Sequence, residues 1–160
     1  MVSELVEIAG SKLSLNLHQG QTKAWDNKAR YVVIIAGSQS GKTSFGPKWL
    51  WREINTCGDG DYLAVTATYD LFKLKMFPEL QRWFGVTLPG WEWHASDRVL
   101  AKGGARIILR SADAEGGLEA ATAKAAWFDE CGQDRVKVSA WEAIQRRLSL
   151  SQGRCLLSTT

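Results

Sequence analysis

The stretch that most constrains the fold is a run of β-branched residues leading straight into a glycine-rich loop. Residues 31–35 read YVVII, and residues 36–43 continue as AGSQSGKT. A short, continuous apolar run bounded by turn residues is typical of a strand in a parallel sheet. The sequence therefore predicts a strand over 31–37, buried on both faces, then a tight loop, and then a helix over 42–55.

The loop has the composition of a phosphate-binding site. Glycines let the backbone turn with its N–H groups pointing inward, and the positive end of the following helix favours an anion. Lys42 would reach the β- and γ-phosphates, and the Thr43 hydroxyl would ligate Mg²⁺. The other candidate ligands are the loop residues Gly37, Ser38, Gln39, Ser40 and Gly41. Ala36 stands where this pattern usually has its first glycine, and the alternative interpretation is a plain glycine-rich turn before a helix.

A second motif ends another apolar run. Residues 125–130 read AAWFDE, which predicts a short buried strand ending in two carboxylates. A carboxylate there is costly unless it holds a cation or a proton. Asp129 would orient Mg²⁺ through its water shell, and Glu130 would act as the general base on the attacking water. An acidic loop without a catalytic role is the alternative. The adjacent glutamate favours an ATPase over a nucleotide kinase.

The rest of the chain alternates predicted helices with predicted strands. The other predicted elements are helices near 18–28, 69–84 and 138–150, strands over 62–68 and 154–160, and a hairpin over 98–112. We expect Pro47 to kink its helix or to cost it a hydrogen bond, and Pro78 to break the helix over 69–84. This alternation predicts an α/β domain with a mostly parallel central sheet flanked by helices. Ligands of such sheets bind beyond the carboxyl ends of the strands.

The composition favours no special class of protein. The net charge is only +3, which does not by itself predict binding to nucleic acid. The three cysteines are far apart and have no metal-ligand spacing, which favours a reduced, cytosolic setting. No apolar run approaches the length that a membrane-spanning helix needs.

Four segments, in order, resemble the ATPase domain of bacteriophage large terminase subunits. Residues 21–43 resemble the start of that domain, with Gln21 as the leading glutamine, and 65–73 resemble its second strand and turn. Residues 106–133 resemble the segment that contains the catalytic Asp-Glu pair, and 153–160 resemble the strand that ends in the coupling motif. The resemblance implies a P-loop NTPase of the RecA-like, additional-strand type.

The resemblance also implies a function. The chain would be an ATP-hydrolysing motor domain that drives double-stranded DNA packaging, with ATP and Mg²⁺ as cofactors. Glu130 and Lys42 would be catalytic, and Gln21 would read the adenine. Thr159, at the end of its strand, would sense the γ-phosphate, with a frayed C-terminus as the alternative. The implied partners are double-stranded DNA, the portal ring and the terminase small subunit. The resemblance also implies a homo-oligomeric ring in the full-length protein, no association with a membrane, and a location in the cytoplasm of an infected bacterium.

The resemblance divides the chain into an N-terminal segment, 1–30, and an ATPase core, 31–160, truncated at the coupling-motif strand and without a nuclease domain. Relatives order the sheet 5-1-4-3-2, so a fifth strand is expected beyond residue 160. Strand 31–37 would then be an edge that self-associates or is covered by the N-terminal segment.

The sequence departs from its relatives at two positions where many of them carry arginine, here Ser38 and Gly116. These positions supply candidate arginine fingers, and their absence leaves open a weakly active or inactive domain. Possible substitutes are Arg110, Arg146 and Arg147, although a surface charge is the alternative for each. A helicase core and a non-catalytic nucleotide-binding remnant remain alternative functions.

Overall fold

The computed structural model describes residues 6–10, 12–114, 118 and 122–160. The strands in chain order are β1 (Val6–Ala9), β2 (Lys12–Leu15), β3 (Tyr31–Ile35), β4 (Gly60–Thr66), β5 (Glu92–His94), β6 (Val99–Lys102), β7 (Ala105–Ser111), β8 (Ala123–Asp129) and β9 (Arg154–Thr159). The α-helices are α1 (Gln19–Asp26), α2 (Lys42–Cys57), α3 (Tyr69–Leu71), α4 (Phe77–Leu80) and α5 (Val138–Ser149). Two segments have π-helical hydrogen bonding, η1 (Phe72–Met76) and η2 (Gln81–Thr87).

Seven strands form one sheet in the order β3-β9-β8-β4-β7-β6-β5. The pairs from β3 to β7 are parallel, and β6 and β5 are added antiparallel. The first four strands in space follow the expected order 1-4-3-2, which places the carboxyl ends of β3, β9 and β8 side by side. At that edge Ile35 is opposite Thr159, and Ser158 is opposite Asp129.

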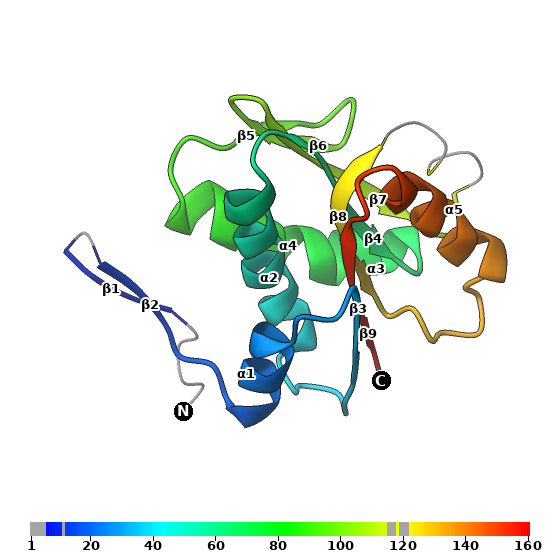
Figure 1. The fold of residues 1–160 in the computed structure, drawn as a ribbon, viewed down its shortest axis with the longest axis horizontal. Coiled ribbons are helices and arrows are strands. Elements are labelled where there is room, and N and C mark those ends of the chain that lie inside the picture. The colour runs from blue at the N-terminus through cyan, green and yellow to red at the C-terminus, as the bar shows by residue number, and fades with distance from the viewer. Residues whose placement is uncertain (1–5, 11, 115–117, 119–121) are drawn as a thin grey trace.

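Helices cover both faces of this sheet. Figure 1 shows α2 and α4 on one side of the strands and α5 on the other. The first face carries a large aromatic core that includes Trp49, Trp83 and Trp127. The second face packs against α5 through Ile144 and Leu148. The predicted α/β architecture with a mostly parallel sheet flanked by helices is confirmed.

The expectation that the strand over 31–37 is buried on both faces is wrong. Among the described residues β3 pairs only with β9, so it is an edge strand. Val32 is buried, but Val33 is 57% exposed and Ile35 is 75% exposed. Successive side chains of a strand point to opposite faces, so one face of β3 lies against the core and the other is open. An apolar run alone does not distinguish such a strand from a central one.

The N-terminal segment contains a hairpin that was not predicted. The strands β1 and β2 pair with each other and with no other described strand. Figure 1 shows this hairpin extending away from the seven-stranded sheet. The expectation that strand pairing by the N-terminal segment covers β3 is therefore wrong for the described residues.

Neither proline ends its helix. Pro47 lies inside α2, which runs unbroken over sixteen residues. Residues 69–87 form one continuous helical segment, in which Pro78 occupies the first turn of α4. The Phe77 N–H bonds to the Phe72 carbonyl five residues earlier, so π-type hydrogen bonding carries the helix up to the proline. The predicted break near Pro78 is wrong for this reason.

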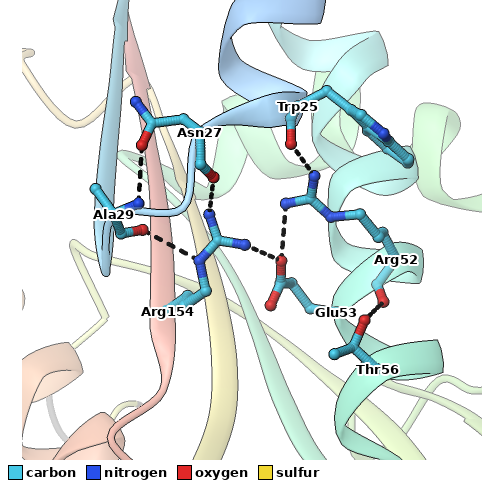
Figure 2. Close-up of polar contacts among 7 residues, drawn as sticks. All are labelled: Trp25, Asn27, Ala29, Arg52, Glu53, Thr56 and Arg154. Carbon is cyan, nitrogen blue, oxygen red and sulfur yellow. Dashed lines mark hydrogen bonds and ion pairs between the residues drawn. The ribbon is translucent and has the colours of Figure 1, made fainter.

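An ionic network around the buried Glu53 fixes the connection between α1 and β3 (Figure 2). The Arg154 guanidinium donates to the carbonyls of Asn27 and Ala29 and to the Glu53 carboxylate, the last over 2.6 Å. Arg52 donates to the same Glu53 oxygen over 2.9 Å and to the Trp25 carbonyl. This network lies at the amino ends of β3 and β9. It therefore holds the last turn of α1 while the first turn of that helix faces the glycine-rich loop.

Candidate functional site

The glycine-rich loop joins the carboxyl end of β3 to the start of α2. Gly41 has a φ of +79°, a value that glycine adopts at little cost. A Cβ at Gly41 would also lie 2.9 Å from the Gln21 side-chain nitrogen. Both the backbone conformation and the lack of space therefore favour glycine at this position. The helix begins at Lys42, and the first N–H groups of a helix have no partner within it. The loop therefore presents backbone donors and the positive end of α2 at the edge of the sheet.

The side chain of Lys42 lies back over this loop and is buried. Its Nζ donates to the carbonyl oxygens of Ala36, over 2.5 Å, and Gly37, over 3.0 Å. In the part of the chain that the structure describes, the buried Ser40 hydroxyl has no hydrogen-bond partner. A buried, unpaired hydroxyl is costly, and a phosphate oxygen in the loop would satisfy it. This orphaned hydroxyl is the feature that fits the loop to an anion.

Helix α1 braces the loop from the side. His18 caps α1 by accepting N–H bonds from Gly20 and Gln21 at Nδ1, and its Nε2 lies 3.0 Å from the Ser40 carbonyl. The buried Gln21 amide accepts from the His18 N–H and donates to the Gly41 carbonyl. Sequence reasoning placed Gln21 near this site but missed His18. The available signal was a capping box, in which the residue before the helix and a Gln three positions later each bond to the other's backbone N–H. Histidine is not among the residues usually found at the first of these positions.

A cavity of about 310 Å³ lies between α1, β3 and the loop. Its walls include Gln21, Ala24, Asn27, Ile34 and Phe45. This volume is within the range of small-molecule sites, and the walls combine an aromatic ring and aliphatic groups with amides. The cavity has the size and chemistry expected for a planar heterocycle whose attached phosphates lie over the loop.

The carboxylate motif reaches the same edge from β8. Thr43 Oγ1 donates to Asp129 Oδ2 over 2.8 Å, and Ser158 Oγ donates to Asp129 Oδ1 over 2.7 Å. Burial raises the pKa of the Asp129 carboxyl, and these two hydrogen bonds oppose that rise. The structure thus brings Thr43 and Asp129 together, although they are far apart in the sequence.

Glu130 follows Asp129 in a left-handed conformation, with a φ of +54°, and is buried. Such a conformation is uncommon for a residue other than glycine and is often found at functional sites. One of its carboxylate oxygens accepts a hydrogen bond from the Thr160 hydroxyl over 3.3 Å. The Thr159 hydroxyl accepts the Gly132 N–H over 3.1 Å, so the end of β9 holds the backbone that follows Glu130.

The protein oxygens at this edge suit Mg²⁺ in type and number. Mg²⁺ is usually held by one or two protein ligands together with waters and substrate phosphates, and the Thr43 hydroxyl and Asp129 carboxylate match that pattern. Within the described ranges no cluster of three or more His, Cys, Asp or Glu side chains could hold a metal ion. The three cysteines are all free.

Two of the candidate arginines donate to backbone carbonyls. Arg110 donates to the Asp97 and Leu109 carbonyls, and Arg147 donates to the Leu118 carbonyl. Ser38 lies in the loop as predicted, and Gly116 is outside the described residues. Arg110 and Arg147 thus each have backbone partners outside the glycine-rich loop.

The comparisons with known proteins identify a family for this chain. The family model described as "Terminase large subunit, T4likevirus-type, N-terminal" matches residues 33–160. No curated protein matches the chain in sequence. None of the helices in the described ranges is long and apolar enough to span a membrane.

Solved structures share the fold at low sequence identity. The large terminase ATPase domain of Thermus phage P74-26 has a TM-score of 0.72 at 20% identity, covering 91% of this chain and 65% of that one. The HK97 bacteriophage large terminase has a TM-score of 0.73 at 13% identity, covering 91% and 33%. A large terminase from a thermophilic bacteriophage, in complex with ATP-γ-S, has a TM-score of 0.68 at 15% identity, covering 88% and 37%.

This chain spans less than two thirds of the length of each of these relatives. The family model, in contrast, covers most of the chain, from β3 with its loop to the carboxylates of β8 and the end of β9. The chain therefore belongs to the T4likevirus-type terminase large-subunit family and corresponds to its N-terminal region.

Proposed function

We propose that this chain is the ATP-hydrolysing motor domain of a terminase large subunit and drives the packaging of double-stranded DNA. The observation that carries the proposal is the 2.8 Å hydrogen bond between Thr43 and Asp129. It joins the first turn of α2 to the end of β8, where a nucleotide-bound cation needs a hydroxyl and a carboxylate together. Family membership supports a packaging motor over a helicase core.

ATP would bind with its phosphates over the loop and its adenine in the cavity beside α1. The loop residues Gly37, Ser38, Gln39, Ser40 and Gly41 would contact the phosphates through backbone N–H groups and the unpaired Ser40 hydroxyl. Lys42 would exchange its carbonyl partners for phosphate oxygens, and Gln21 would read the adenine edge. A large terminase of similar structure has been solved in complex with ATP-γ-S and with ADP, which supports a nucleotide site in this fold.

The two carboxylates would divide the chemistry between them. Thr43 and Asp129 would hold Mg²⁺, which when bound neutralises charge on the phosphate oxygens. Glu130 would take the proton from the attacking water, since its buried carboxylate lies directly beside the metal-orienting residue. Thr159, at the end of β9, would sense the γ-phosphate and pass the change to the backbone at Gly132.

The remaining parts of the proposal concern the assembled motor. Double-stranded DNA, the portal ring and the small terminase subunit would be its partners, and the full-length protein would act as a homo-oligomeric ring in the cytoplasm of an infected bacterium. Membership of the terminase family supports this setting. The ring would also explain how an arginine from a neighbouring subunit could complete the phosphate site.

A steady-state assay of phosphate release, with and without duplex DNA, tests the proposal. We expect ATP hydrolysis by this chain and a higher rate when duplex DNA is present. Nucleotide binding with no phosphate release under either condition would support the non-catalytic alternative. Stimulation by single-stranded DNA alone would favour a helicase core.

A further inference from the structure

The inference concerns Ser158, a fully buried residue of β9. Ser158 belongs to the segment that resembles the strand ending in the coupling motif, but its side chain was given no role of its own. Its hydroxyl lies between the buried side chains of Trp127 and Asp129, which both belong to the neighbouring strand β8. Trp127 Nε1 donates to Ser158 Oγ over 3.2 Å, and Ser158 Oγ donates to Asp129 Oδ1 over 2.7 Å. The other Asp129 oxygen accepts from Thr43. The carboxylate is thus held from two sides, by β9 and by α2.

The direction of each hydrogen bond follows from the chemistry of the groups. An indole N–H can only donate, so the Ser158 oxygen must accept from Trp127. The single hydroxyl proton of Ser158 is then available for its other partner, which is the Asp129 carboxylate. The hydrogen bond from Trp127 therefore leaves the Ser158 hydroxyl proton directed at Asp129. Rotation of that proton away from Asp129 would break the bond to the carboxylate.

The indole itself is fixed by α2. A Cβ built on Gly46 would lie 2.0 Å from the Trp127 ring, so the ring packs directly against the helix backbone. The same helix carries Thr43 in its first turn. The packing of Trp127 on Gly46 thus sets the position of β8 relative to the helix that supplies the second cation ligand.

We propose that Ser158 is a positioning residue for the magnesium site, with Trp127 orienting its hydroxyl. By holding Asp129 Oδ1, Ser158 would keep the carboxylate in the one orientation that serves a cation at Thr43. The inference rests on the proposed function, in which Asp129 orients Mg²⁺. Loss of a hydrogen-bonded partner of a metal ligand typically costs 10–100-fold in metal affinity, so this role has a measurable size.

The test is a calorimetric titration of ADP into the chain over a range of Mg²⁺ concentrations and in metal-free buffer. For Ser158→Ala we expect the Mg²⁺ concentration that gives half of the metal-dependent gain in ADP affinity to rise about tenfold. Affinity for ADP in metal-free buffer should stay as in the wild type. Trp127→Phe keeps an aromatic ring in the core but removes the N–H together with part of the indole, and it should shift the Mg²⁺ dependence in the same direction by a smaller factor.

Ser111→Ala is the matched control. Ser111 ends β7 at the same edge of the sheet and is buried, and within the described residues its hydroxyl has no hydrogen-bond partner. This variant should keep the wild-type Mg²⁺ dependence. An unchanged Mg²⁺ dependence in Ser158→Ala would overturn the inference. If that variant does not fold, an unchanged Mg²⁺ dependence in Trp127→Phe would overturn it instead. If ADP binding by the wild type shows no Mg²⁺ dependence at all, the proposed role of Asp129 is wrong and this inference with it.

Discussion

Glu130 combines burial with a backbone conformation that is uncommon for a residue other than glycine. It is buried, its φ is +54°, and it directly follows the carboxylate that contacts Thr43. A non-glycine residue in this conformation carries a cost of order 1–3 kcal/mol, which the surrounding structure offsets. The N–H of Cys131 bonds to the Ser158 carbonyl, and the N–H of Gly132 bonds to Thr159, so β9 holds the strained turn. The Thr160 hydroxyl also donates to the Glu130 carboxylate, so the residues at the end of β9 hold both the backbone and the side chain.

Glu130→Gln should retain ATP binding and lose hydrolysis. An amide keeps the shape of the side chain but cannot accept the proton of the attacking water, and loss of a general base costs about 10²–10⁴-fold in rate. Phosphate release and calorimetric ATP binding measure the two effects separately. Glu142→Gln, an exposed change on α5, is the control and should leave both unchanged. Hydrolysis by Glu130→Gln at the wild-type rate would show that another group is the base.

Gln21→Ala should weaken ATP binding more than the binding of inorganic triphosphate. The Gln21 amide lines the cavity that we assign to the adenine, and it also donates to the Gly41 carbonyl. A residue that reads the base affects ATP selectively, whereas one that only braces the loop affects every phosphate ligand alike. Titrations with ATP, GTP and triphosphate distinguish these roles. Equal losses for ATP and GTP would assign Gln21 to the loop and not to the base.

Single residues of the site could be predicted where a local motif carries the chemistry. Lys42, Thr43 and Asp129 were singled out because their neighbours in sequence form a pattern, and the structure brings Thr43 and Asp129 together at one edge of the sheet. Ser158 was missed because its role depends on pairing in register with Asp129 across two strands. His18 was missed because histidine is not among the usual capping residues and because its partner in the loop, the Ser40 carbonyl, is a backbone group.

At the scale of elements, the contact between α2 and β8 determines how the two motifs meet. Gly46 lets the helix backbone approach the Trp127 ring, with no room for a Cβ between them. Phe45 and Trp49, both fully buried, flank this contact from the same helix. Close packing of this kind tolerates no added volume, so the distance between the loop and the carboxylates depends on one glycine.

Gly46→Ala should therefore lower the free energy of unfolding by about 1–3 kcal/mol, the usual cost of overpacking a core. Gly85→Ala is the control within a helical segment, because a Cβ there would meet nothing within 4 Å. In a helix an alanine is up to about 1 kcal/mol more favourable than a glycine, so the control should be neutral or stabilising. Urea unfolding followed by circular dichroism gives both values. Equal stability of the two variants would mean that the close contact does not exist in solution.

Elements with strong periodicity were predicted closely, and those that depend on tertiary contacts were not. The helix over 138–150 and the hairpin over 98–112 correspond to α5 and to β6 with β7. The strand β5 is only three residues long and exists because β6 pairs with it. The hairpin of β1 and β2 was missed although apolar residues alternate with polar ones in both strands, at Val6 and Ile8 and at Leu13 and Leu15, because each strand is only four residues long.

For the whole molecule, the open edge of the sheet has the largest consequence. One side of β3 has no strand partner within the described residues, and its outward side chains include Val33 and Ile35. An exposed apolar edge without charge or proline is a template for pairing with another strand. No other described strand of the chain pairs with this edge, so a strand that did so would come from outside the described residues.

We expect the isolated chain to self-associate through β3, with a mass that rises with concentration in light scattering. Val33→Lys should reduce this association, because a charge in the middle of an edge strand disfavours pairing. Val86→Lys is the control, since Val86 is 82% exposed on η2 and away from this edge. A wild type that stays monomeric at all concentrations would contradict the prediction, and so would equal effects of the two lysines.

The central claim is that the loop between β3 and α2 binds the phosphates of ATP, and one titration tests it most directly. A non-hydrolysable ATP analogue with Mg²⁺ is titrated calorimetrically into the wild type, Lys42→Ala and the exposed-lysine control Lys75→Ala. The account predicts binding by the wild type and Lys75→Ala, and no measurable binding by Lys42→Ala, with all three melting at similar temperatures. Binding of the analogue by Lys42→Ala with wild-type affinity would contradict the account.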